Sequence, residues 1–145
     1  MKKIIFGICI VFFLSINVWT EDVNKIVVET LVKSSKSWNG EALPDYPQGK
    51  PEVTILRIKI PAGAKLEMHE HPIINAGVLL KGELTVVTED KKTLHLKAGD
   101  SIVEVVNKVH YGKNEGAQAA EIIVFSAGVV NKPITIKETS VKTTF

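Results

Sequence analysis

Two histidines stand two residues apart in the stretch KLEMHEHPIIN, and this spacing could hold a metal ion. The stretch predicts a strand, in which residues i and i+2 share a face, so His69 and His71 point the same way as Glu67. A neutral imidazole nitrogen is the commonest metal ligand in proteins, and two on one rigid strand form a chelating pair. Two surface histidines on a polar strand would have the same spacing, so a third ligand has to decide.

His110 is the candidate for that third ligand. It follows a predicted turn at Asn107-Lys108, and we expect it to reach the histidine pair from the opposite sheet. The fourth histidine, His95, stands between Leu94 and Leu96 in the stretch TLHLK. If the two leucines face the core, alternation along a strand turns His95 toward solvent.

The elements that must position these residues are predicted to be strands. Short apolar or alternating runs recur with turn residues between them, which is typical of an all-β sandwich or barrel. We expect strands within residues 25–33, 53–60, 66–71, 75–80, 83–90, 92–100, 101–114, 119–128 and 134–138. Residues 34–52 contain three prolines and two glycines and predict a loop.

Two spaced motifs cover residues 63–114, and in them the chain resembles the cupin superfamily. The first motif, Gly-x5-His-x-His-x3,4-Glu-x6-Gly, reads Gly63-AKLEM-His69-Glu70-His71-PII-Asn75-AGVLLK-Gly82. The second, Gly-x5-Pro-x-Gly-x2-His-x3-Asn, reads Gly99-DSIVE-Val105-Val106-Asn107-KV-His110-YGK-Asn114. All spacings agree. Asn75 replaces the Glu of the first motif. In the second, Val105 replaces the Pro, and Asn107, which tolerates positive φ in a turn, replaces the Gly.

The resemblance implies a single jelly-roll barrel, or double-stranded β-helix, with a metal site. His69, His71 and His110 would be ligands, and Asn75 takes the position of the fourth. A carboxamide oxygen is neutral, so this ligand set holds a metal less tightly than one with a carboxylate but leaves it a stronger Lewis acid. The cofactor we expect is a divalent transition metal, and Fe, Mn, Ni, Cu and Zn all suit such ligands.

Several polar and aromatic residues could join this site. Glu67 is a candidate partner of His69 or a general base, or else a solvated charge at the barrel mouth. Tyr111 and Trp38 could line the mouth of a pocket or pack in the core. Glu104 stands in the apolar run SIVEVV, where a carboxylate needs a partner if it is buried. We expect Asn114 to fix the turn after His110.

The first residues predict export. Lys2 and Lys3 precede an apolar run of 16 residues, shorter than the ~20 of a membrane-spanning helix, so residues 1–20 are interpreted as a signal peptide. Its removal leaves 16 basic against 16 acidic residues, and a neutral protein gives no reason to expect a nucleic-acid partner. The only cysteine, Cys9, leaves with it. We expect a periplasmic or extracellular protein without a stable membrane anchor.

The predicted organisation is a signal peptide over residues 1–20, an N-terminal arm and loop over 21–50, a barrel over 51–138 and a tail over 139–145. Two functions remain open. One is a metal-dependent enzyme, an oxidoreductase or dioxygenase-like protein, that acts on a small organic molecule. The other is a non-catalytic cupin that binds a small ligand or a metal. We also expect a homodimer, in which residues 25–33 would be a swapped or edge-adding strand.

Overall fold

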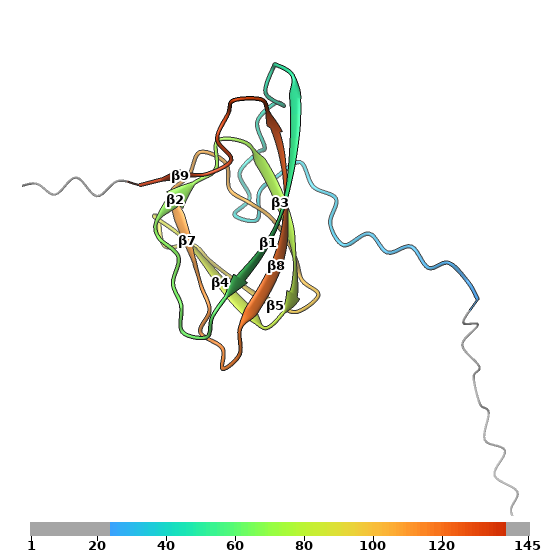
Figure 1. The fold of residues 1–145 in the computed structure, drawn as a ribbon, viewed down its shortest axis with the longest axis vertical. Coiled ribbons are helices and arrows are strands. Elements are labelled where there is room, and N and C mark those ends of the chain that lie inside the picture. Colours follow the sequence, from blue (N-terminus) through green and yellow to red (C-terminus); the bar gives the residue numbers. More distant parts are fainter. Residues whose placement is uncertain (1–23, 139–145) are drawn as a thin grey trace, which may run out of the picture.

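Nine strands form two antiparallel sheets in the computed structural model, which describes residues 24–138 (Figure 1). The all-β prediction is therefore confirmed. The strands are β1 (Pro51–Ile60), β2 (His69–Glu70), β3 (Ile74–Lys81), β4 (Glu83–Thr88), β5 (Thr93–Lys97), β6 (Ser101–Val103), β7 (His110–Lys113), β8 (Ala120–Val129) and β9 (Ile136–Lys137).

Sequence neighbours are mostly not sheet neighbours. One sheet has the order β1-β8-β3-β6 and the other the order β5-β4-β7-β2-β9. The longest ladder joins β1 to β8 over ten residue pairs, from Pro51 opposite Val129 to Ile60 opposite Ala120. This interleaving makes the two sheets one barrel, because each strand except β4 is followed in the chain by a strand of the other sheet.

The core lies between the sheets and follows from the alternation along the strands. In β1, Leu56, Ile58 and Ile60 point inward, whereas Ile55 is 66% exposed on the outer face. Burying a Leu or Ile side chain stabilises a fold by about 1.5–3 kcal/mol. The buried apolar cluster consists of Ile60, Leu79, Leu84, Val86, Leu96, Ile102, Ala120, Ile122 and Val124.

Turn residues set the corners of the barrel. Gly82, between β3 and β4, has a φ of 75°, and a Cβ there would lie 2.8 Å from the carbonyl oxygen of Ala119. Only glycine satisfies both conditions. Asn107 has a φ of 53°, so the replacement of the motif glycine by asparagine keeps the left-handed conformation that the sequence predicts.

Some predicted elements differ from the observed ones. Residues 25–33 form no strand in the described part of the chain, although their β-branched residues predicted one. The stretch 66–71 contributes only two residues to β2, and 101–114 forms two strands, β6 and β7, separated by a turn. The predicted signal peptide, residues 1–20, and tail, residues 139–145, lie outside the described residues.

The segment before β1 is attached to the edge of the four-stranded sheet. Trp38 donates its backbone N–H to the carbonyl oxygen of Val103, at 2.9 Å, and its side chain packs against the core cluster. Ser101 donates its hydroxyl to the carbonyl of Leu31 at 3.1 Å. These contacts hold the segment on the sheet edge.

Within residues 24–138 there is no helix long and apolar enough to cross a bilayer.

Candidate metal centre

Three histidines meet on the inner face of the five-stranded sheet. His69 in β2 and His110 in β7 are directly opposite each other across the antiparallel pair. The prediction that His110 arrives from the opposite sheet is therefore wrong: both strands belong to the same sheet. His71 follows β2 and faces the same way as His69, because the two residues are two positions apart. Its carbonyl accepts a hydrogen bond from the backbone of Asn107, at 2.8 Å, which ties the two motifs together.

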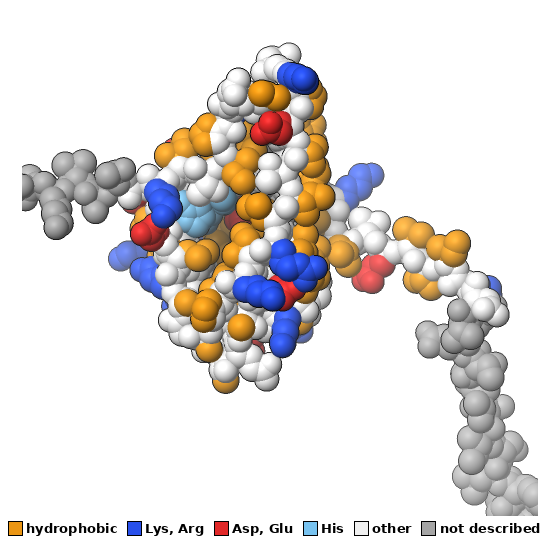
Figure 2. All heavy atoms as spheres, viewed as in Figure 1, with side chains coloured by type: hydrophobic (Ala, Val, Ile, Leu, Met, Phe, Trp, Pro, Cys, Tyr) orange, Lys and Arg blue, Asp and Glu red, His pale blue; other side chains and the backbone are white. Residues whose placement is uncertain are grey.

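The rings are close enough to bind one ion. Their centroids lie 4.5 Å apart for His69 and His110, and 5.0 Å apart for the other two pairs. Each residue offers a ring nitrogen, and these three nitrogens lie within 4.8 Å of one another. Figure 2 shows histidine side chains inside a hollow that opens on one face of the molecule.

Backbone carbonyls fix the orientation of all three rings. The Nδ1–H of His69 donates to the carbonyl of Glu67 at 2.8 Å, that of His71 to the carbonyl of Ile134 at 2.9 Å, and that of His110 to the carbonyl of Lys108 at 2.9 Å. A carbonyl only accepts, so each Nδ1 carries the proton and each Nε2 keeps its lone pair in the neutral ring. Such outer hydrogen bonds orient metal-binding histidines and raise their basicity.

Burial keeps two of these rings neutral. Burial lowers the pKa of His71 to about 4, with a smaller contribution from repulsion by His110 and His69. Burial likewise lowers the pKa of His110 to about 4, and repulsion by His69 adds to this. Both side chains are therefore unprotonated at neutral pH, as a ligand must be.

A cavity of about 430 Å³ lies beside the triad. Its polar residues are the three histidines together with Asn75, Glu104, Ser126 and Thr135, and the charged residues Lys65, Glu67 and Lys137 also line it. The rest of the wall is mainly apolar and includes Leu56, Ile58, Ile60, Leu66, Leu84, Val86, Ile122 and Val124. The arrangement is an apolar chamber with one polar wall, which is typical of small-molecule sites.

Two buried oxygens in this chamber have no hydrogen-bond partner. One is Oδ1 of Asn75 in β3, a residue that is 1% exposed. The other is Oε2 of Glu104, which follows β6. Burial raises the pKa of Glu104 to about 7. A buried polar oxygen without a partner is costly, and a cation would satisfy both. The three imidazoles fit a divalent transition metal, and the two oxygens line the same cavity.

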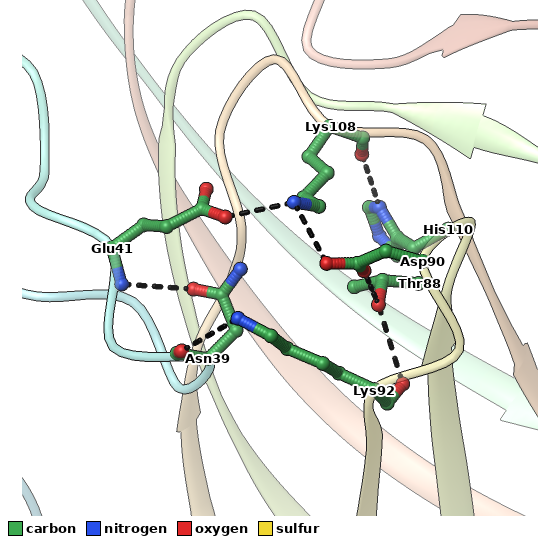
Figure 3. Close-up of polar contacts among 7 residues, drawn as sticks. All are labelled: Asn39, Glu41, Thr88, Asp90, Lys92, Lys108 and His110. Carbon is green, nitrogen blue, oxygen red and sulfur yellow. Dashed lines mark hydrogen bonds and ion pairs between the residues drawn. The ribbon is translucent and has the colours of Figure 1, made fainter.

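A polar network holds the loop that orients His110 (Figure 3). The Lys108 ammonium lies 2.8 Å from the Glu41 carboxylate and 3.2 Å from that of Asp90, while its carbonyl accepts from His110. Asp90 also accepts a hydrogen bond from the hydroxyl of Thr88. Glu41 of the N-terminal segment thus acts on the metal centre indirectly: it holds Lys108, and the carbonyl of Lys108 orients the ring of His110.

The candidates Glu67 and Tyr111 lie differently from the triad. The Glu67 carboxylate is 73% exposed and pairs with Lys137 at 2.6 Å, which lowers the pKa of Glu67. It is the carbonyl of Glu67, rather than the carboxylate, that contacts His69. Tyr111 does not line the chamber: it alternates with His110 in β7 and faces the other side, and the Lys65 ammonium lies 3.9 Å from the centre of its ring.

The remaining candidates lie where alternation and turn chemistry predict. His95 is exposed on β5 and pairs with the hydroxyl of Thr85 at 3.0 Å, away from the triad. Asn114 is 1% exposed. Its amide donates to the carbonyls of Ile60, Pro61 and Gln118, so Asn114 joins the end of β1 to the loop between β7 and β8. Glu104 is the functional candidate that sequence reasoning left unassigned, and its one sequence signal was an acidic residue within an apolar run.

A family model described as "Cupin domain" matches residues 56–126. This chain belongs to the cupin superfamily. The matched residues include both histidine motifs from His69 to His110, so the resemblance seen in the sequence is confirmed. No protein with curated function matches the chain.

Solved cupin structures share the fold. The DMSP lyase DddQ from Ruegeria pomeroyi superposes with a TM-score of 0.52 at 19% identity, over 59% of this chain and 42% of the lyase. The oxalate decarboxylase from Lactobacillus farciminis gives 0.52 at 21%, over 59% of this chain and 26% of that enzyme. The polyketide cyclase RemF from Streptomyces resistomycificus gives 0.53 at 13%, over 65% of each chain.

These similarities are informative about fold and not about reaction. This chain spans less than half of the lyase and about a quarter of the decarboxylase. The three neighbours are a lyase, a decarboxylase and a cyclase, so one fold supports different chemistries. The function of this cupin must therefore be argued from its own site.

Proposed function

We propose that this cupin binds a divalent transition metal through His69, His71 and His110 and is an enzyme that acts on a small organic molecule. The observation that carries the proposal is the convergence of three neutral imidazoles at the polar wall of an apolar chamber. Each ring is held by a carbonyl on its Nδ1 side, so the three lone pairs are oriented before any ion arrives. A barrel that only bound an apolar ligand would not need this arrangement.

The chamber indicates the kind of substrate. Its volume of about 430 Å³ and its apolar wall suit a small molecule with a largely apolar body. The polar end of that molecule would lie at the triad, where Asn75 and Glu104 offer oxygen atoms. The apolar wall excludes water, which strengthens every electrostatic interaction between the polar groups and the substrate.

The reaction class that we favour is an oxidation, as in a dioxygenase-like oxidoreductase. A metal bound by three histidines with open positions can act as a Lewis acid or, if it is redox-active, exchange electrons. The second candidate is a non-catalytic module that binds a small ligand or the metal itself. The neutral Asn75 favours this second candidate, because it lacks the charge of a carboxylate that could act as ligand or base.

Metal analysis of the native protein, purified without an affinity tag, tests the proposal. We expect one transition-metal ion per chain, its loss in His69→Ala, and its retention in the matched control His95→Ala. Oxygen uptake and product formation with a panel of small apolar acids and alcohols then separate enzyme from binding module. A native protein without any metal would contradict the metal site, and a stoichiometric metal without turnover of any compound would favour the binding module.

We also propose that the protein is exported, on the basis of residues 1–20. Their basic start and apolar run are typical of a cleaved leader. Mass spectrometry of the protein from its native source should find an N-terminus near residue 21. An intact Met1 on the native protein would contradict export by cleavage.

A homodimer is the assembly that the outer surface favours, and we infer that a second copy covers the four-stranded sheet. Ile55 and Phe125, opposite each other in β1 and β8, are 66% and 43% exposed. An antiparallel sheet with a solvated face normally carries polar residues on that face. The exposed Ile55 and Phe125 therefore indicate a face that a partner covers. Residues 25–33 leave from the edge of this sheet (Figure 1), and three of their apolar side chains, Ile26, Val27 and Val28, are at least 86% exposed.

The second copy is the favoured partner because Ile26, Val27 and Val28, on a segment of the same chain, are also exposed apolar side chains. Sedimentation of the wild type should show a dimer, and Ile55→Glu, or deletion of residues 1–33, should give a monomer. The charge change Glu89→Lys, at an exposed turn after β4 of the other sheet, is the control and should leave the dimer intact. A wild-type monomer over a wide concentration range would contradict the inference.

A further inference from the structure

Glu104 is placed beside the triad by the four-stranded sheet. It follows β6, and its backbone N–H donates to the carbonyl of Asn75 in β3 at 2.9 Å. The residue is 9% exposed and lies between Val103 and Val105, which are 9% and 0% exposed. Its side chain lines the chamber that the histidines line from the other sheet. The two sheets therefore bring a carboxylate and three imidazoles to the same cavity.

The carboxylate has no partner that explains its burial. Its Oε2 makes no hydrogen bond, and the ionisable group nearest to it among the described ion pairs is Nε2 of His110 at 3.8 Å. That nitrogen carries no proton in the neutral ring, because Nδ1 of His110 donates to the carbonyl of Lys108. An ionised carboxylate that faces a lone pair is repelled rather than stabilised, whereas a cation between the two atoms would stabilise both.

The separation suits such a cation. Two donors bound to one ion, each about 2.1 Å from it, lie roughly 3 to 4 Å apart, and the observed 3.8 Å lies in that range. A hydrogen bond would require a shorter distance. The ring of His110 and the carboxylate of Glu104 are thus spaced as two ligands rather than as donor and acceptor.

We propose that Glu104 supplies the carboxylate ligand of the metal centre, the role that the motif gives to the Glu replaced here by Asn75. The two residues are neighbours, since β3 pairs with β6 and the backbone N–H of Glu104, just after β6, donates to the carbonyl of Asn75. The anionic ligand is therefore moved by one strand rather than lost. The inference rests on the proposed metal site and adds to it a negative charge that partly neutralises a divalent ion.

Co²⁺ binding tests this role without any substrate. Affinity is measured by competition with a chelator, and the visible absorption of the Co²⁺ protein reports its ligands. Glu104→Gln keeps the shape of the side chain and should weaken binding at least about tenfold and change the absorption spectrum. Glu52→Gln is the matched control, because that carboxylate is exposed on β1 and does not line the chamber, and it should bind Co²⁺ like the wild type.

Variants of Asn75 separate loss of a ligand from loss of structure. Asn75→Glu added to Glu104→Gln should restore most of the affinity, whereas Asn75→Glu alone should gain little, because a carboxylate is already present. This non-additivity is the signature of one shared role. If Glu104→Gln fails to fold, the small gain of Asn75→Glu alone still supports the inference, and a large gain overturns it.

The remaining outcomes distinguish this inference from the proposed function. Unchanged affinity and spectrum in Glu104→Gln, together with lost binding in His69→Ala, would overturn the role of Glu104 and leave the triad standing. Weaker binding with an unchanged spectrum would also overturn it, since Glu104 would then act only through its charge. A wild type that binds no Co²⁺ would overturn the metal site itself, and Glu104 with it.

Discussion

Acidification of the metal-free protein should destabilise it in a way that the buried site predicts. His71 and His110 have a pKa of about 4 when folded and an ordinary value of 6.5, so between these values the unfolded chain binds two more protons. Stability from the two histidines is present above pH 6.5 and is lost as the pH falls toward 4. Glu104 acts in the opposite direction: its pKa rises from 4.5 to about 7 on folding, so between these values the folded chain holds one more proton.

The magnitude follows from the proton count. On unfolding, the two histidines bind two protons and Glu104 releases one, so the net uptake is one proton. Each proton taken up changes the free energy of unfolding by about 1.4 kcal/mol per pH unit. The free energy of unfolding should therefore fall by about 2 kcal/mol from pH 6.5 to pH 5. In Glu104→Gln the opposing group is absent, so the fall should be about twice as large. Exposed carboxylates with a lowered pKa, such as Glu41 and Asp90, titrate below this window.

Urea unfolding after chelator treatment measures both slopes. The wild type and Glu104→Gln are unfolded at pH 5.0, 5.5, 6.0 and 6.5, and the free energy in water is plotted against pH. The expected result is a positive slope in both proteins that is about twice as steep in the variant. Equal slopes would refute the assignment of Glu104 as a buried group with a raised pKa. A flat wild type and a flat variant would refute the burial of neutral His71 and His110.

Three further predictions concern the scaffold and the triad. His69→Ala should lower metal affinity by at least about tenfold, whereas the exposed His95→Ala should not change it; equal affinities in chelator competition would contradict the triad. Gly82→Ala should destabilise the fold by about 1–3 kcal/mol in urea unfolding, because of its positive φ and a backbone oxygen 2.8 Å from the new Cβ. Gly99→Ala has a positive φ but open space, and should cost less; a similar or larger loss would refute the steric argument. Lys108→Met removes both ion pairs at the loop that orients His110 and should weaken metal binding several-fold, with a return toward wild type in Lys108→Arg; unchanged binding would show that the loop is held without them.

The sequence by itself determined the strands and much of the triad, since both depend on local geometry. Alternation put His69 and His71 on one face and turned His95 outward, as observed, because side chains in a strand alternate irrespective of what lies opposite. The turn positions followed for the same reason: Gly82 and Asn107 adopt the left-handed conformation that their residue types favour. The spacing of the two motifs then identified the cupin fold.

Pairing across the barrel was decided only by the tertiary structure. Periodicity says whether a side chain points inward but not which inward residues meet, because that depends on the order of strands in each sheet. His110 lies beside His69 in one sheet, and Glu104 reaches the same cavity from the other. Residues 25–33 have the composition of a strand but form none in the single chain, since a strand requires a backbone ladder and no described strand forms one with them.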